Sequence, residues 1–514
     1  MRTSIREQAA SYCRGPLRPL QVDSWRFVRI GSESSDSSAD RSRRDRIPSS
    51  GPRKSMRDPG SFRDPSGYVF RRDGRIFRAL SDEAYRNFLL MRSSGAYGAL
   101  RGRGWLISAE EVELDDAAHR GLRIVEHPKL PFVSYPYEWP ISLLKRAALL
   151  HLDLHICALD FGFTLSDASA YNIQFCGIEP VFIDTPSLVP YRDGDLWTGQ
   201  RQFVEQFLNP LLLGSLCGVF PNAWYRGAVE GIPTADTARL IGPLRRWLSP
   251  QILANITLPD LLQRKARRDP GGATTKPRPL PKDALLFMLT RLRRWISRLQ
   301  RRNVGPTEWQ NYASTNESYQ SDEEQRKQAF IAEFSKAAAA GCAWDLGCNT
   351  GLYSEILLKN GTHTVVGFDF DLYALEAAVD RATSKNLQLL PLFSDLANSS
   401  PAQGWAETER QGISSRIAAD AVIALALVHH LAIGRNIPLP SVLQWLIGLA
   451  PRGVIEFVPK SDPMIKRMMR FRKDIFPGYG KEQFEAALRS GAETVRVLEL
   501  SPGGRTLYEY KRSS

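Results

Sequence analysis

The sequence predicts an α/β protein, and the clearest evidence lies in residues 305–514. An apolar stretch at residues 342–346 ends in a glycine-containing loop, and a second apolar stretch at residues 364–368 ends in Asp369. The spacing between the two stretches leaves room for one helix, as in a βαβ unit of a parallel sheet. Upstream, short apolar stretches separated by turn residues predict an α+β domain in residues 59–262.

The loop after the first of these strands, residues 345–351, reads Asp-Leu-Gly-Cys-Asn-Thr-Gly. Gly347 and Gly351 allow the backbone to come close to a ligand. The acid that precedes the first glycine, Asp345, would repel a dinucleotide pyrophosphate and attract an ammonium group. Asp369 can accept hydrogen bonds from a ribose diol. Together these residues favour a nucleoside that carries an amino acid over a dinucleotide.

Further strands and helices complete this sheet in the expected order. Helices are predicted at residues 311–339 and 372–383. Strands are predicted at residues 387–393, 420–430 and 452–458, followed by a terminal hairpin at 494–510. Such a hairpin adds an antiparallel strand at the end of the sheet, which dinucleotide-binding Rossmann domains lack.

Residues 305–514 resemble the class I S-adenosylmethionine (SAM) methyltransferases, and the loop at 345–351 resembles their first motif. The resemblance implies a Rossmann-like sheet of seven strands with SAM as cofactor. It implies that Asp369 holds the ribose and that Asp395, after the third strand, contacts the adenine amino group. The residues that it assigns to SAM are Asp345, Gly347, Asn349, Gly351, Asp369 and Asp395.

Two histidines, His429 and His430, follow the fourth predicted strand, near the expected position of the methyl group. Methyl transfer from a sulfonium requires alignment and sometimes a base, and an imidazole titrates near neutrality. Either histidine is therefore a candidate catalytic base. The alternative is that an apolar stretch ending in His-His-Leu has no catalytic role. Glu456, at the end of the fifth strand, is a further candidate base, and the alternative that we favour for it is a salt bridge within the sheet.

The amino-terminal domain begins with a predicted β-hairpin at residues 67–78, whose turn is Arg72-Asp-Gly-Arg. A helix is expected at residues 82–92. Residues 142–159 predict a long buried helix, because their apolar side chains recur at three- and four-residue steps. Residues 195–262 are predicted to be largely helical.

Asp167, Asn172 and Asp184 follow that long helix at spacings that resemble the catalytic and metal-binding loops of protein-kinase-like folds. The resemblance implies that Asp167 orients an accepting hydroxyl while Asn172 and Asp184 hold Mg²⁺. Leu165 and Ser166 replace the usual His-Arg, Asp184-Thr-Pro replaces Asp-Phe-Gly, and no glycine-rich loop precedes them. Three interpretations remain open: these side chains cap turns, they belong to a degenerate recognition domain, or they serve an active phosphotransferase.

Residues 263–304 are predicted to form a linker followed by a basic amphipathic helix at 282–302. Leucine, methionine, tryptophan and isoleucine side chains share one side of this helix, and arginines share the other. Such a helix can lie on an anionic membrane surface, on the inner face of the plasma membrane, or can pack against a protein core.

Charge and cysteine content limit the other classes of function. The net charge is +13. Residues 1–58 contain thirteen basic and seven acidic residues, and residues 264–302 contain thirteen and two. The excess of positive charge therefore lies in a tail and a linker, so no nucleic-acid partner is expected.

Six cysteines without a C-x-x-C pair predict neither a metal site nor disulfides, which indicates a cytoplasmic protein. Residues 1–58 are expected to be disordered, or to precede a true start at Met56.

From about Met56 onward, the chain resembles the rhizobial nodulation protein NoeA family. The motifs that carry this resemblance are residues 167–175, 182–187, 344–351 and 424–433. The resemblance implies a SAM-dependent methyltransferase with a host-specific role in nodulation. It implies as acceptor a glycan, such as the lipo-chitooligosaccharide Nod factor, or a small molecule. The alternatives are phosphotransferase activity in the amino-terminal domain and a non-catalytic SAM-binding or scaffold protein.

Overall fold

The computed structural model describes residues 56–114, 119, 121–268, 278–302, 321–416 and 419–513. The disordered tail predicted for residues 1–58 therefore lies almost entirely outside the described residues. The same is true of most of the predicted linker after residue 268 and of the first ten residues of the helix predicted at 311–339.

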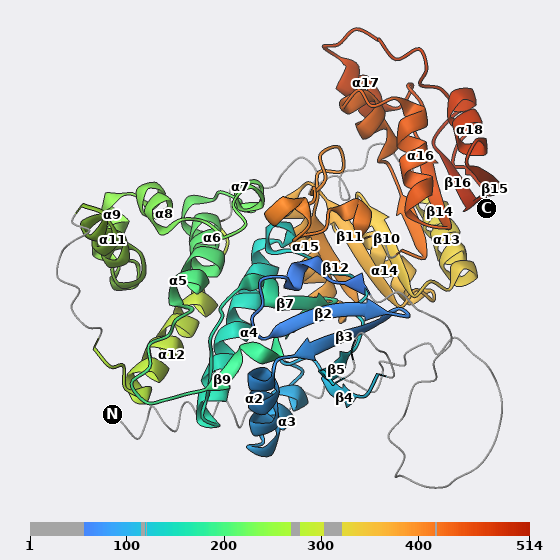
Figure 1. Ribbon diagram of the computed structural model, residues 1–514. Helices are drawn as coiled ribbons and strands as arrows, with labels where there is room; N and C mark the ends of the chain where they lie inside the picture. Colours follow the sequence, from blue (N-terminus) through green and yellow to red (C-terminus); the bar gives the residue numbers. More distant parts are fainter. Residues whose placement is uncertain are drawn as a thin grey trace.

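The carboxyl-terminal part is built on one sheet of seven strands (Figure 1). The strands are β10 (Cys342–Leu346), β11 (Thr364–Asp369), β12 (Leu389–Phe393), β13 (Ala421–Ala424), β14 (Arg452–Phe457), β15 (Ala492–Glu499) and β16 (Thr506–Arg512). Their order is β12-β11-β10-β13-β14-β16-β15, and β16 runs antiparallel to both of its neighbours while the first five strands are parallel. The predicted seven-stranded sheet with a terminal antiparallel strand is confirmed.

Helices precede the first strand and connect most of the later strands, but the described residues between β12 and β13 contain no α-helix. The helices are α13 (Ser321–Ala338), α14 (Leu352–Lys359), α15 (Leu372–Lys385), α16 (Leu439–Leu449), α17 (Pro463–Met469) and α18 (Lys481–Arg489). The prediction was wrong for the length of the fourth strand, because β13 ends at Ala424 rather than at residue 430. Ala426 has a left-handed backbone (φ 50°), and the chain then forms the π-helical turn η11 (His430–Gly434).

The amino-terminal part contains an antiparallel sheet of five strands in the order β1-β2-β3-β5-β4. These strands are β1 (Met56–Arg57), β2 (Gly67–Arg72), β3 (Arg75–Leu80), β4 (Glu110–Val112) and β5 (Arg123–His127). The predicted hairpin is confirmed, with Asp73 (φ 52°) and Gly74 (φ 75°) in its turn. Two positive φ angles fit the type I′ turn that matches strand twist. Helices α2 (Asp82–Ser93) and α3 (Ala96–Gly102) lie beside the sheet.

The long buried helix is confirmed as α4 (Ile141–Asp160), most of whose residues are inaccessible to solvent. Two short antiparallel pairs follow it: β6 (Phe163–Leu165) with β9 (Leu188–Pro190), and β7 (Ile173–Cys176) with β8 (Glu179–Phe182). The next helices include α5 (Gln200–Phe203), α6 (Asn209–Leu212), α7 (Asn222–Gly227), α8 (Thr234–Ile241), α9 (Pro243–Leu248), α10 (Pro250–Ile252) and α11 (Leu258–Arg268). Helix α11 continues through residue 262, where the sequence predicted a boundary.

Helix α12 (Lys282–Arg298) is the predicted basic amphipathic helix, and it packs along α4 (Figure 1). Its apolar side chains are buried there: Leu285, Leu286, Leu289, Leu292 and Ile296. Asp153 on α4 also pairs with Arg293. Of the two alternatives for residues 282–302, packing of the apolar side against a protein core is the one that the structure shows, and membrane contact through this helix stays a prediction. Among the described residues, no helix is long and apolar enough to cross a bilayer.

The two parts of the chain share one hydrophobic core. Its side chains form a connected cluster whose members range in sequence from Leu80 to Tyr510. Phe132, from the segment before α4, packs edge-on against Trp344 of β10 and Phe368 of β11, with ring centroids 5.7 and 5.8 Å apart. The amino-terminal part therefore contributes directly to the interior of the carboxyl-terminal sheet.

A buried ion pair joins the two parts at the same place. The Arg416 guanidinium donates to Glu138 Oε2 over 2.9 Å and to the Val133 carbonyl oxygen over 2.7 Å. It also lies 4.4 Å from the centroid of the Tyr135 ring. Both members of the pair are almost inaccessible to solvent. Because the charges are shielded from water, each requires the other.

We predict that Arg416→Met lowers the free energy of unfolding by about 3 kcal/mol, because Glu138 would remain buried without its counter-ion. Chemical denaturation of the full chain measures the change. The matched control is Arg239→Met, which breaks the exposed pair with Asp236 and should change stability by less than about 0.5 kcal/mol. Equal effects of the two substitutions would contradict the role given to the buried pair.

Candidate functional site

The glycine-containing loop lies at the carboxyl edge of the sheet, where open α/β sheets bind ligands. Gly347 (φ 80°), Asn349 (φ 49°) and Gly351 (φ 77°) all have left-handed backbones. A Cβ atom on Gly351 would lie 2.9 Å from Leu389 Cδ2, so no side chain fits there without a shift. The amides of Gly347 and Cys348 both donate to the Phe368 carbonyl oxygen, over 2.8 and 3.0 Å. The loop is therefore fixed to β11.

Asp369 connects this loop to the end of β11. Its carboxylate accepts from the amide of Asn349 over 2.8 Å and from the amide of Asp371 over 2.9 Å. Burial raises the pKa of Asp369 to about 6, even though these hydrogen bonds oppose the rise. At neutral pH the ionised carboxylate keeps lone pairs that can accept further hydrogen bonds.

Asp345 lies at the end of β10, directly before the loop, and is buried. The Ser354 hydroxyl, from α14, donates to its Oδ2 atom over 2.6 Å. Burial, with a contribution from Asp369, raises the pKa of Asp345 to about 7. Among the residues that the structure describes, no basic side chain forms an ion pair with it. A buried carboxyl without a counter-ion fits a ligand that brings a positive charge.

Asp395 follows β12, at the same edge of the sheet. Its side chain is half-buried and pairs with Arg435 over 3.0 Å, while it also accepts from the Ala397 amide over 3.1 Å. Any contact of Asp395 with an adenine would therefore compete with Arg435.

Two residues at this edge were missed by sequence reasoning. The Ser394 hydroxyl is buried and has no hydrogen-bond partner within the described part of the chain. Phe370, directly after Asp369, keeps 51% of its surface exposed. Their position just after the two strand ends was the signal that could have identified them.

His429 and His430 follow β13, and the glycine loop lies near the residues that precede them. A Cβ atom on Gly347 would lie 3.8 Å from Leu427 Cδ1. Burial lowers the pKa of His430 to about 4 and holds that of His429 well below its usual value. Both rings are therefore neutral at physiological pH and hold a proton poorly. A base performs best with a pKa near the working pH, so this environment disfavours proton abstraction by either ring.

Glu456 fixes the segment that leads to these histidines. As expected from the sequence, it forms a salt bridge: its carboxylate accepts from Lys327 Nζ over 2.8 Å. The same carboxylate accepts from the amide of Ala426 over 2.7 Å. Arg505, 3.6 Å from Glu456, also pairs with Asp462. The left-handed turn at Ala426 thus depends on a buried carboxylate with two cationic neighbours.

In the amino-terminal part, Asp167, Asn172 and Asp184 come together as the sequence predicted. Asn172 Nδ2 lies 3.0 Å from Asp167 Oδ2 and 3.5 Å from Asp184 Oδ2. Burial, and then the charge of Asp184, raise the pKa of Asp167. Arg78 of β3 donates to Asp184 over 2.5 Å and to Asp64 over 3.3 Å. Arg78 therefore neutralises Asp184, the carboxylate that the resemblance assigns to a metal ion.

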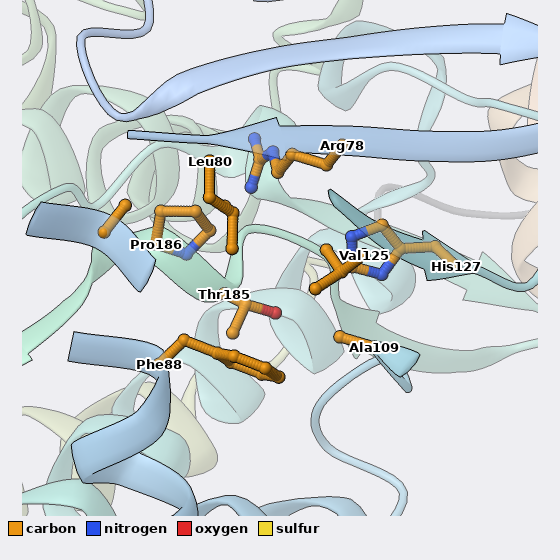
Figure 2. A pocket seen from close by; sticks show the side chains of 9 residues that line it. Arg78, Leu80, Phe88, Ala109, Val125, His127, Thr185 and Pro186 are labelled. Carbon is orange, nitrogen blue, oxygen red and sulfur yellow. The ribbon is translucent and has the colours of Figure 1, made fainter. Parts of the chain in front are cut away.

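The space beside Arg78 is small. Figure 2 shows it between Arg78, His127 and the segment Thr185–Pro186, which directly follows Asp184. The cavity measures about 10 Å³, which is room for about one water molecule. This cavity is too small for a nucleotide.

The strand order β12-β11-β10-β13-β14-β16-β15, with the loop at the end of β10, is the Rossmann-like fold of class I methyltransferases. Nodulation protein NoeA of Rhizobium meliloti (strain 1021) is 44% identical over 457 residues, which are 88% of this chain and 96% of that protein. The chain belongs to the NoeA family. No family model matches it.

Solved structures match part of this chain. N-methyltransferase NodS from Bradyrhizobium japonicum WM9 is 12% identical over 38% of this chain and 98% of its own, with a TM-score of 0.29. The PH0226 protein from Pyrococcus horikoshii OT3 is 18% identical over 41% of this chain and 100% of its own, also at 0.29. WbdD, crystallised with a kinase inhibitor, is 17% identical over 37% of this chain and 41% of its own, at 0.27. The fold assignment rests on the strand order itself.

Proposed function

We propose that this protein is a SAM-dependent methyltransferase. The observation that carries the proposal is Asp345, a buried carboxyl at the base of the glycine loop that forms no ion pair with a described residue, although the more distant charge of Lys327 opposes the rise of its pKa. The ammonium group of the SAM amino acid would supply the missing positive charge. The backbone of the glycine loop, at Gly347, Asn349 and Gly351, would surround this ammonium group.

The remaining contacts follow from the same edge of the sheet. Asp369 would accept hydrogen bonds from the ribose, and Asp395, or its neighbour Ser394, would meet the adenine. Phe370 offers an exposed aromatic face beside the ribose position. The bound cofactor supplies an electrophilic methyl group, so the protein mainly needs to align the acceptor and exclude water. A SAM-dependent reaction also fits the cytoplasmic location expected from the sequence.

We further propose that the acceptor is the lipo-chitooligosaccharide Nod factor or a related glycan. The support is membership in a family named for a nodulation protein. The acceptor would approach the carboxyl end of β13, where residues 425–427 adjoin the glycine loop. His429 and His430, neutral in this environment, would act there by hydrogen bonding and shape rather than as strong bases.

We predict that Asp345→Asn weakens SAM binding roughly tenfold at about pH 7.5 and much less at about pH 5.5. The pKa of Asp345 is raised to about 7, so the wild-type carboxyl is ionised only at the higher pH and is already neutral at the lower one. Isothermal titration of the full chain with SAM measures both affinities. Asp420→Asn is the matched control, because Asp420 accepts from the Cys342 amide at the opposite end of β10. A loss that is independent of pH would contradict the ion pair.

Transfer itself is tested with SAM that carries a labelled methyl group and a lipo-chitooligosaccharide preparation as acceptor. We expect label in the acceptor with the wild-type chain and none with Gly351→Ala, whose added Cβ meets Leu389. Gly74→Ala is the control, because Gly74 has nearly the same φ but no atom within 4 Å of an added Cβ. SAM binding without transfer to any glycan would favour the non-catalytic SAM-binding alternative. Absence of SAM binding would refute the proposal.

A second candidate function is phosphoryl transfer in the amino-terminal part. The observation that favours it is the meeting of Asp167, Asn172 and Asp184, whose oxygens suit Mg²⁺. In this arrangement Arg78 holds Asp184, so a metal ion would have to displace the guanidinium. The alternative is that the same side chains form a recognition domain without chemistry.

We predict for this second candidate that Mg²⁺-ATP raises the melting temperature of the full chain, and that ATP with a chelator does not. Asp184→Asn should abolish the shift, because it removes the carboxylate that would hold Mg²⁺ together with Asn172. Each variant is compared with itself in the absence of nucleotide, so its lower intrinsic stability does not affect the result. No shift in the wild-type chain would exclude the active phosphotransferase.

A further inference from the structure

Helices α9 and α11 carry large apolar side chains on their solvent side. On α9 these are Leu244, Trp247 and Leu248, at the spacing of one helix face, and Trp247 and Leu248 are 58% and 72% exposed. On α11 they are Leu258, Leu261 and Leu262, again at that spacing. Both helices lie at the end of the molecule opposite β14–β16 (Figure 1). We call these six side chains the α9/α11 surface.

Folding of this region does not require the α9/α11 surface. The helices around it already contribute Ala238, Ile241, Ile252 and Ile256 to the main hydrophobic core, in which these four side chains are buried. Helix α9 itself has no buried residue. Exposed apolar groups gathered on successive helices cost free energy in water, and on soluble proteins they mark contact surfaces.

The charges around this surface are almost all positive. Residues 234–268 contain seven arginines and lysines against two aspartates, Asp236 and Asp260. Both aspartates are ion-paired within the region: Asp236 with Arg239, and Asp260 with Arg246 and Arg264. Arg245 and Lys265, beside the exposed leucines and tryptophan, are themselves exposed. The partner of such a surface must therefore combine apolar groups with negative charge.

We propose that the α9/α11 surface docks the protein on a membrane of anionic phospholipids. Leucines at helical spacing would enter the boundary between headgroups and acyl chains, Trp247 would lie at headgroup level, and Arg245 and Lys265 would meet lipid phosphates. The protein would rest on the bilayer and not cross it. This binding is independent of methyl transfer and differs from the contact expected through α12.

Vesicle flotation of the full chain tests the proposal. We expect binding to vesicles of phosphatidylcholine mixed with phosphatidylglycerol, little binding to phosphatidylcholine alone, and weakening by salt. The double variant Trp247→Ala/Leu262→Ala should reduce binding roughly tenfold or more. Arg245→Glu/Lys265→Glu should reduce it by reversing two charges, and Arg245→Glu also removes the hydrogen bond from Arg245 to the Leu216 carbonyl oxygen (2.8 Å). All four side chains are exposed, so an unchanged melting temperature is expected to accompany the loss.

The matched control is Trp405→Ala. Trp405 is 69% exposed but lies beside Glu407 and Glu409, so it should not contribute to binding an anionic surface. Three results would overturn the proposal: no binding to anionic vesicles, equal binding by the wild-type chain and both double variants, or equal loss with Trp405→Ala. If vesicles are not bound and Trp247→Ala/Leu262→Ala instead converts a dimer to a monomer in sedimentation, the surface joins two copies of the chain.

Discussion

The burial of Glu138 and Arg416 against each other is the constraint on which the arrangement of the molecule depends. Glu138 belongs to the segment before α4, and Arg416 belongs to the loop between β12 and β13. Around them, Phe132 enters the packing of Trp344 and Phe368. A charge pair that is closed to water tolerates little displacement, so it fixes how the two parts meet.

This shared interior also supports the candidate SAM site. Glu376 of α15 accepts from the Ser142 amide at the start of α4 over 3.1 Å, and Arg301 lies 3.6 Å away. Phe220 packs edge-on against Tyr373, with centroids 4.9 Å apart, and contacts the cluster of Cys348, Leu372 and Leu375 beneath the glycine loop. The amino-terminal part thus helps to hold the loop and α15. Residues 305–514 in isolation would expose these apolar contacts to water.

Features set by local sequence were predictable, and features set by long-range packing were not. The hairpin turn at Asp73-Gly74, the apolar strands β10 and β11, and the meeting of Asp167 with Asn172 all follow from patterns within a few residues. The left-handed turn at Ala426 depends on Glu456, thirty positions away. The low pKa of His430 depends on burial and on Arg505. From the sequence, the apolar side of α12 could contact either a membrane surface or a protein core. Its packing against α4 shows the second, and the position of α4 depends on the whole fold.

The loop between β12 and β13 lies between two groups of acidic residues. One group is Asp167 and Asp184 in the amino-terminal part, and the other is at the carboxyl edge of the seven-stranded sheet. The loop's Arg410 guanidinium lies 4.3 Å from the centroid of the Tyr171 ring, one residue before Asn172. Its Gln411 amide donates to the Tyr135 hydroxyl over 2.9 Å. The same loop begins just after Asp395 and ends in Arg416. The loop therefore contacts Tyr171, in the segment that carries Asp167 and Asn172, and continues from the edge of the candidate SAM site. This loop is therefore one of the physical contacts between the two groups, in addition to the hydrogen bond between Ser142 and Glu376.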